Sequence, residues 1–239
     1  MRNIILVENL KKSYKSKLVV DDLCFSVKRG EFFGLLGHNG AGKSTTIDCI
    51  LGLKNFESGT VRILDMNPKK SRKELFERVG VQLQSSSYQD KIKIYELCEE
   101  ISALYKVADD YKRLLKEFSL EKMKNNYVAT LSGGEKQKLA ILLALIPKPE
   151  VVFLDELTTG LDTEARREVW KQLKKLKKEG VTILLTSHYM DEIEELCDKI
   201  CIINNGKEVI SGTVEEVISA SPYTKLEDAY LWYMEKEEV

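Results

Sequence analysis

Residues 37–44 read Gly37-His38-Asn39-Gly40-Ala41-Gly42-Lys43-Ser44. This is the spacing of a phosphate-binding loop, in which four residues separate a glycine from a Gly-Lys-Ser triplet. An apolar stretch that ends at Leu36 precedes the loop, and a helical pattern with Ile47 and Ile50 follows it. Glycines let backbone N–H groups wrap around phosphate oxygens, Lys43 adds a positive charge, and the Ser44 hydroxyl can bind magnesium. A glycine-rich turn without a ligand is the alternative, but the strand–loop–helix context favours nucleotide binding.

The composition is that of an ordinary globular protein. The chain has 239 residues, of which 43% are hydrophobic and 31% are charged, and its formal net charge is −1. This balance excludes collagen-like, low-complexity and largely disordered chains. A nearly neutral chain has no large positive field, so we expect no nucleic-acid partner.

Cysteines and apolar runs indicate a soluble, intracellular chain. The five cysteines are odd in number and scattered, which predicts small buried thiols in a reducing compartment rather than a disulfide framework; they are Cys24, Cys49, Cys98, Cys197 and Cys201. The longest fully apolar run covers residues 139–146. It is far shorter than the ~20 residues that span a bilayer.

Apolar patterns along the chain predict an α/β fold. Alternating apolar residues at 23–28 and 61–63 are typical of half-buried strands and predict a small antiparallel sheet near the N-terminus. Continuous apolar strands at 151–154, 181–186 and 199–203 alternate with amphipathic helices, which predicts a parallel-sheet core.

The strand signal is absent from about residue 88 to 147, where apolar residues recur at three- and four-residue spacing. We therefore expect a helical subdomain inserted into a domain that covers residues 1–215. Residues 216–239 are expected to form a short helical tail.

A second candidate site lies at the end of the apolar strand at 151–154, where Asp155 and Glu156 follow directly. Ligands bind at the carboxyl ends of buried parallel strands. Asp155 is placed to hold magnesium, and Glu156 is placed to orient or deprotonate an attacking water. Alone this pattern is weak, but together with the phosphate loop it forms the second half of one site for phosphoryl transfer.

The third motif reads Leu131-Ser132-Gly133-Gly134-Glu135. Ser132 and Glu135 form the pattern of a helix capping box, which is the structural alternative. A cap needs no pair of glycines, and bare backbone at a helix N-terminus makes a second anion site. One nucleotide held by Lys43 has no evident use for both sites in one chain. We therefore expect Ser132 and Gly134 to contact the γ-phosphate bound to another copy.

Five features follow one another in an order that resembles the nucleotide-binding subunit of an ATP-binding cassette (ABC) transporter. They are the phosphate loop, the Leu131–Glu135 motif, the Asp155-Glu156 strand end, Gly160-Leu161-Asp162 and His188. The resemblance covers about residues 1–215 and implies a P-loop NTPase core of the ABC type. It also implies ATP and Mg²⁺ as cofactors.

The resemblance assigns a role to each matching residue. It implies ATP contacts by Tyr14, Gly37, His38, Asn39, Gly40, Ala41, Gly42, Lys43, Ser44 and Thr45, with Tyr14 stacking on adenine. It implies catalytic roles for Gln84, Glu156 and His188, and metal contacts by Ser44, Gln84 and Asp155. The signature and dimer-interface set is Leu131, Ser132, Gly133, Gly134, Glu135 and Asp162. A buried core tyrosine is the lesser alternative for Tyr14, whereas a single histidine after a strand, such as His188, is taken alone more often structural.

Three positions depart from the family pattern. Leu157 follows Glu156, and Leu83 precedes Gln84, where proline is common in both places. Lys93 stands where a small polar residue is usual. Neither leucine removes a ligand, but each is expected to loosen a turn between the hydrolysis site and the interface. Lys93 leaves the docking contact to the membrane partner the least defined part of the pattern.

The leading hypothesis is an ATPase subunit that powers a transporter, with export favoured by the similarity of residues 186–198 to the drug- and antibiotic-export branch. Its partners would be a second ATP-binding subunit in a homodimer and a separate integral membrane permease. The subunit would lie in the cytoplasm on the inner face of the membrane. The alternative is a soluble ABC ATPase of DNA repair or translation, which the short chain and its single cassette disfavour.

Overall fold

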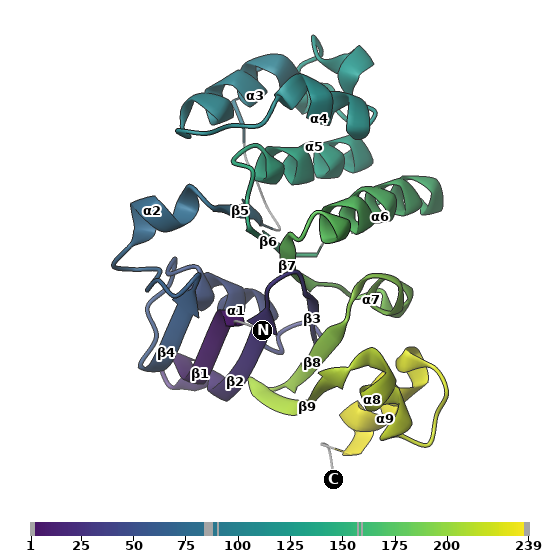
Figure 1. Ribbon diagram of the computed structural model, residues 1–239. Helices are drawn as coiled ribbons and strands as arrows, with labels where there is room; N and C mark the ends of the chain where they lie inside the picture. The colour runs from purple at the N-terminus through teal and green to yellow at the C-terminus, as the bar shows by residue number, and fades with distance from the viewer. Residues whose placement is uncertain (1–2, 84–87, 90, 157, 159, 237–239) are drawn as a thin grey trace.

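The computed structural model describes residues 3–83, 88–89, 91–156, 158 and 160–236. Two sheets, one of three strands and one of six, form the centre of the molecule (Figure 1). One group of helices lies apart from the three-stranded sheet. Among the described residues, no helix is both long enough and apolar enough to cross a bilayer.

A six-stranded sheet carries the candidate site. Its strands, in spatial order, are β5 (Val79–Gln82), β6 (Val151–Leu154), β7 (Thr182–Thr186), β3 (Phe32–Leu36), β8 (Lys199–Asn204) and β9 (Lys207–Thr213). The first five are parallel, and β9 is antiparallel to β8. The carboxyl ends of β3, β6 and β7 therefore meet at one edge, where the predicted site residues follow them.

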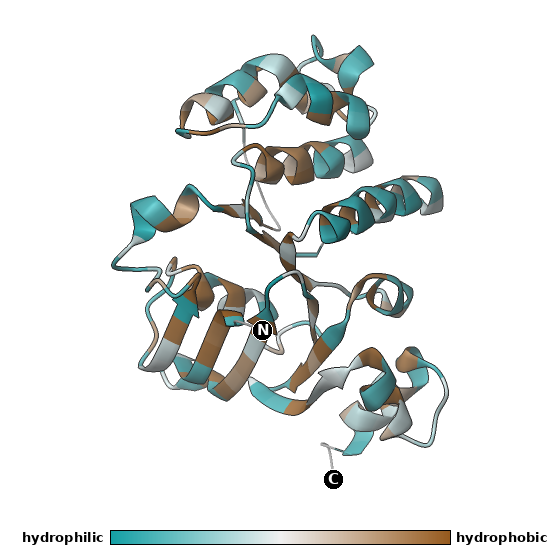
Figure 2. Ribbon diagram, in the orientation of Figure 1, coloured by the Kyte–Doolittle hydropathy of each residue, from teal (hydrophilic) through white to brown (hydrophobic). Residues whose placement is uncertain are grey.

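Both faces of this sheet are buried, which explains the continuous apolar runs. On β6, Val152 and Leu154 belong to one core cluster, whereas Val151 and Phe153 belong to the other. Successive side chains of a strand point to opposite faces, so one strand serves two cores. Brown, hydrophobic segments follow these strands through the middle of the molecule (Figure 2).

The predicted N-terminal sheet is confirmed. It consists of β1 (Asn3–Tyr14), β2 (Lys17–Lys28) and β4 (Ser58–Ile63), all antiparallel, with β1 in the centre. Val7 of β1 pairs with Phe25 on one side and Val61 on the other. These side chains pack into the same core as α1 (Lys43–Ile50), which places this sheet beside the phosphate loop.

The inserted helical region is also present. It contains α3 (Ile94–Ala103), α4 (Tyr111–Glu117), two short 3₁₀ turns, η1 (Glu121–Met123) and η2 (Val128–Thr130), and α5 (Gly133–Leu145). The remaining helices are α2 (Arg72–Phe76), α6 (Thr163–Lys178), α7 (Met190–Leu196), α8 (Val214–Ser219) and α9 (Leu226–Lys236). Helices α3, α4 and α5 lie together at the top of Figure 1.

The C-terminal helices pack against the main core. Leu226, Ala229 and Tyr233 belong to the same core cluster as α5 and one face of the sheet. The Tyr233 hydroxyl donates to the carbonyl oxygen of Val217 at 2.9 Å. The domain boundary at residue 215 stays a prediction.

One prediction about the cysteines is wrong. Cys24 is exposed, whereas the other four thiols are buried. On β2, Leu23, Phe25 and Val27 point into the core, so Cys24 points to the opposite face. That face of the three-stranded sheet is open to solvent at this position.

Candidate functional site

The phosphate loop connects β3 to α1 as predicted, and two of its glycines are sterically required. A Cβ atom on Gly37 would lie 2.5 Å from the carbonyl oxygen of Ile203. Gly42 has φ of +106°, and its Cβ would lie 2.6 Å from the carbonyl oxygen of Val19. His38, Asn39 and Gly40 form the exposed rim of the loop. The loop is therefore wedged between β2 and β8, with its rim open to a ligand.

Lys43 closes the loop from within. Its Nζ atom donates to the carbonyl oxygens of Gly37 at 2.7 Å and His38 at 3.1 Å, and the residue is only 6% exposed. Burial lowers the pKa of Lys43, and the negative charges of Glu156 and Asp155 oppose that shift. The ammonium group thus belongs to the same electrostatic site as the two carboxylates.

The turn between β8 and β9 braces the loop from outside. Nε2 of His38 lies 3.0 Å from Oδ1 of Asn204, and Nδ1 lies 2.7 Å from the carbonyl oxygen of Asn39. The N–H of Gly206 donates to the carbonyl oxygen of Ala41 at 3.0 Å. These contacts fix the backbone of the loop before any ligand binds.

Asp155 and Glu156 follow β6 as predicted, and one hydroxyl joins them. The Thr186 hydroxyl donates to Oδ1 of Asp155 at 2.6 Å and accepts from the N–H of Glu156 at 2.8 Å. Asp155 is only 4% exposed. Glu156 has φ of +53°, a left-handed conformation that is uncommon for a non-glycine residue and turns the chain sharply after Asp155.

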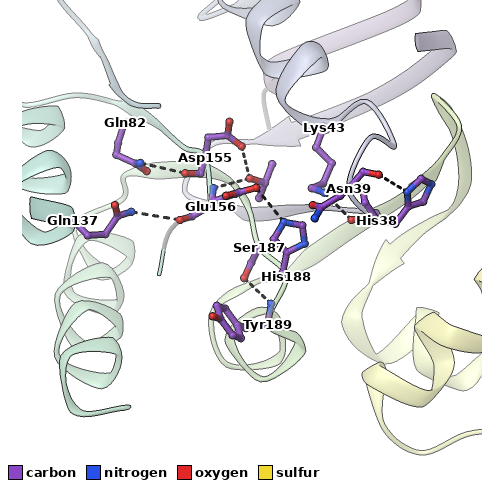
Figure 3. A network of polar contacts seen from close by, with 12 residues as sticks. His38, Asn39, Lys43, Gln82, Gln137, Asp155, Glu156, Ser187, His188 and Tyr189 are labelled. Carbon is purple, nitrogen blue, oxygen red and sulfur yellow. Dashed lines mark hydrogen bonds and ion pairs between the residues drawn. The ribbon is translucent and has the colours of Figure 1, made fainter. Parts of the chain in front are cut away.

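The structure brings Glu156 and His188 together. Nε2 of His188 lies 3.1 Å from Oε1 of Glu156 (Figure 3). His188 follows β7, the neighbour of β6 in the sheet, which explains how the two side chains meet. Lys43 and the rim of the phosphate loop lie next to this pair in the same view.

The donor set fits a magnesium ion held largely by phosphates. Among the described residues, no three His, Cys, Asp or Glu side chains cluster in a way that could hold a metal. Mg²⁺ is commonly bound by one or two carboxylates together with substrate phosphates and waters. A single buried carboxylate, Asp155, and the half-buried hydroxyl of Ser44 meet that requirement.

The Leu131–Glu135 motif, called the signature segment below, forms the N-terminus of α5. Its predicted capping box is present: the N–H of Glu135 donates to the Ser132 hydroxyl at 3.2 Å, and the N–H of Ser132 donates to Oε2 of Glu135 at 2.8 Å. Ser132 and Gly133 are exposed, and a Cβ on Gly133 would meet nothing within 4 Å. Leu131 is buried and anchors the segment. The helix therefore begins at an open surface.

Asp162 and Tyr14 lie at the surface. Asp162 caps α6, because its Oδ1 atom accepts from the N–H of Ala165 at 2.8 Å. The Tyr14 ring is partly exposed, and the Nζ atoms of Lys12 and Lys54 lie 4.8 and 5.5 Å from its centroid. Tyr14 is thus not a core tyrosine. Thr45 is half-buried in the first turn of α1.

Sequence reasoning missed three side chains that contact Asp155 or Glu156. Besides Thr186, these are Gln82, whose Nε2 atom donates to the carbonyl oxygen of Asp155 at 3.2 Å, and Gln137, whose Nε2 atom donates to that of Glu156 at 3.4 Å. The only available signal was that Gln82 and Thr186 end their strands. Gln84, which was assigned catalytic and metal contacts, and Leu157 lie outside the described residues.

Comparison with known proteins agrees with this architecture. Residues 20–159 match the family model described as "ABC transporter". The chain is 39% identical over 221 residues to the Nod factor export ATP-binding protein I of Ralstonia nicotianae, covering 90% of this chain and 69% of that protein.

Two solved structures are similar over most of their length. One, described as the ATP-binding subunit of an ABC transporter, has a TM-score of 0.89 and 28% identity and covers 97% of this chain and 99% of that one. The other, a dimeric bacterial ABC transporter cassette named MJ0796, has a TM-score of 0.79 and 25% identity, and covers 88% and 98%. The chain therefore belongs to the ABC transporter family, as an ATP-binding and ATP-hydrolysing subunit.

Proposed function

We propose that this subunit cleaves ATP at a site completed by a second copy, and that this reaction drives export through a separate membrane-spanning permease. The observation that carries the proposal is the contact between His188 and Glu156 beside the buried Lys43. It places an acid–base pair next to a phosphate-binding cation, which is the chemistry that phosphate-bond hydrolysis requires.

Each residue of the site has a distinct task in the proposal. Backbone N–H groups of the phosphate loop and the Lys43 ammonium bind the β- and γ-phosphates. Ser44 and Asp155 would hold Mg²⁺, which would neutralise phosphate charge. Glu156 accepts a proton from the attacking water. His188 holds the Glu156 carboxylate in place and donates a hydrogen bond toward the γ-phosphate.

One neighbouring hydroxyl keeps this geometry fixed. The Thr186 hydroxyl is bonded to both Asp155 and the backbone of Glu156, so the metal ligand and the base share one support. Preorganised groups of this kind lower a barrier because they do not reorient during the reaction. Tyr14, whose ring is partly exposed, is proposed to stack on the adenine.

The signature segment is proposed to face the second copy. Ser132 and Gly133 are exposed at the N-terminus of α5, where backbone N–H groups favour an anion. In a two-fold dimer, this segment of one copy would cap the γ-phosphate held by Lys43 of the other. The similarity to a dimeric ABC cassette supports this arrangement. Loss of the γ-phosphate then removes charge-assisted hydrogen bonds from the interface.

The permease, the direction of transport and the location are inferred together. The relative from Ralstonia nicotianae is described as an export ATP-binding protein. We infer that this chain works on the cytoplasmic face of the membrane with an integral permease, and that residues 85–96, of which 85–87 and 90 lie outside the described residues, face that partner.

The test is phosphate release from ATP by the purified chain, with Mg²⁺ or with EDTA. We expect saturable hydrolysis that needs Mg²⁺ and is lost in Asp155→Asn. The exposed ion-pair carboxylate Glu195 supplies a control, and Glu195→Gln is expected to retain activity. Hydrolysis that is insensitive to EDTA would rule out the metal assignment. Export is tested separately in inverted vesicles that carry the chain together with a candidate membrane-spanning permease.

A further inference from the structure

Glu192 is a fully buried carboxylate to which the proposed mechanism assigns no task. It lies in α7, one helical turn after His188, and its exposure is 0%. Its Oε1 atom accepts a hydrogen bond from the Trp170 indole Nε1 of α6 at 2.9 Å. A buried carboxylate is costly unless it is well bonded, so its position calls for an explanation.

Helices α6 and α7 are joined by several polar contacts, and Glu192 makes the buried one. Arg166 pairs with Asp191 at 3.3 Å, Lys174 pairs with Glu195, and Nζ of Lys177 donates to the carbonyl oxygen of Leu196. Glu195 and Lys174 are about half exposed. Exposed pairs contribute little, so the Trp170–Glu192 bond, which ends on a fully buried carboxylate, is one contact that can transmit a displacement between the helices.

The other carboxylate oxygen of Glu192 accepts no hydrogen bond within the described part of the chain. Oε2 of Glu192 and Oγ1 of Thr158 are both buried and have no partner in hydrogen-bonding geometry. Burial, the largest influence, raises the pKa of Glu192, and the side chains of Ser187, Trp170 and Thr158 oppose that shift. A small shift of Thr158 relative to α7 would let its hydroxyl pair with this oxygen of Glu192.

These contacts join the helix that begins at Asp162 to the helix that follows His188. Helix α6 begins at Asp162, the residue expected to face the second copy, and α7 begins directly after the His188 turn. We propose that Glu192 is the positioning residue that couples α6 and Thr158 to His188, so that the His188–Glu156 contact, which the single chain already makes, is held in place when the dimer closes. The inference rests on the roles proposed above for Glu156 and His188.

The test compares Glu192→Gln with Glu195→Gln, the exposed contact of the same two helices. Glutamine keeps the shape and an acceptor for Trp170 but loses the charge. We expect kcat to fall about tenfold in Glu192→Gln with KM for ATP within about twofold, because a misplaced reacting group affects the chemical step. Glu195→Gln should stay within about twofold of the parent in both constants.

Trp170→Phe gives a second variant, which removes the donor and keeps a ring in place. Its effect and that of Glu192→Gln should not add in the double variant, because both break one contact. A purely structural role would lower the melting temperature without a split between kcat and KM. If kcat of Glu192→Gln lies within twofold of the parent, or if the two effects add fully, the inference is overturned.

Fluorescence gives a readout that does not depend on turnover. The chain has two tryptophans, so Trp232→Phe leaves Trp170 as the single emitter. With Glu156→Gln also present, ATP and Mg²⁺ should shift Trp170 emission, and the shift should disappear in Glu192→Gln. If ATP and Mg²⁺ do not shift Trp170 emission in the variant that keeps Glu192, the coupling is overturned. If the parent hydrolyses no ATP, the proposed function fails, and this fluorescence comparison alone then decides the coupling.

Discussion

Nε2 of His188 lies 3.1 Å from Oε1 of Glu156, although 32 positions separate the two residues in the chain. The contact exists because β6 and β7 are neighbours in the sheet and both residues follow the carboxyl ends of their strands. A side chain that accepts a proton gains from a partner that holds it in one rotamer. The pair therefore gives the most direct test of catalysis.

Glu156→Gln should separate binding from hydrolysis. The amide keeps the shape but cannot accept the proton, so we expect turnover to fall by at least ~10²-fold. ATP binding, which depends on Lys43 and the loop backbone, should persist. Size-exclusion chromatography with ATP should then show dimers that accumulate because hydrolysis no longer releases them. A monomer under these conditions would count against the shared site.

Lys43→Ala should weaken ATP binding itself. Hydrogen bonds to a charged group contribute about 1.5–3 kcal/mol, so the dissociation constant should rise roughly 10- to 100-fold. Isothermal titration calorimetry of the monomer measures this directly. Lys175→Ala, which removes an exposed ion pair with Glu117 far from the loop, is the control. Unchanged affinity in Lys43→Ala would contradict the assigned pocket.

Ser132 allows a charge test that leaves the helix intact. Aspartate is as good an N-cap as serine, so Ser132→Asp should keep α5 folded. It places a negative charge where the partner's γ-phosphate is expected, and we predict a loss of turnover of at least about tenfold with ATP affinity of the monomer nearly unchanged. Ser132→Asn, which caps without charge, is the matched variant. If monomer affinity falls in Ser132→Asp as much as in Lys43→Ala, the site is not shared between copies.

The parts of the fold that the sequence predicts are those in which local pattern and burial agree. β6 is apolar at every position because both faces are covered, and the Ser132–Glu135 capping box is a local interaction of four residues. The phosphate loop is equally local, since its glycines and lysine act through their own backbone and their immediate neighbours.

The supporting side chains were missed because their roles depend on pairing between distant strands. Thr186 reads as a β-branched residue at a strand end, and nothing near it in the chain indicates that Asp155 lies opposite. Gln82 bonds to the backbone of β6 only because β5 pairs with it in parallel. Cys24 was misjudged because the period-two pattern does not say which face of a three-stranded sheet is covered.

The thiols should differ sharply in reactivity. Burial raises the pKa of Cys98 to about 12 and that of Cys49 to about 11, so neither forms the reactive thiolate near neutral pH. Cys24 is exposed. Titration of the folded protein with Ellman's reagent should therefore show one fast thiol, which disappears in Cys24→Ser and remains in Cys98→Ser. A fast thiol that remains in Cys24→Ser would mean that a buried cysteine becomes accessible.

Thr186→Val tests whether the shared hydroxyl supports the reaction beyond supporting the fold. Valine keeps the shape but leaves Oδ1 of Asp155 and the N–H of Glu156 without this partner, which costs about 1–3 kcal/mol for each buried group. We expect a lower melting temperature, a fall in kcat and a higher Mg²⁺ concentration at half-maximal activity, because Asp155 and Glu156 lose a common support. Thr186→Ser should restore all three.

The matched control for this prediction lies on the same strand. Thr182 is also fully buried, and its hydroxyl accepts from the N–H of Gly30 at 2.9 Å, away from the site. Thr182→Val should therefore lower the melting temperature to a similar extent, while kcat and the Mg²⁺ requirement of the folded protein stay close to the parent values. Both variants are measured well below their melting temperatures. If Thr182→Val and Thr186→Val lose kcat equally, the Thr186 hydroxyl supports the fold of the sheet and has no separate role in the reaction.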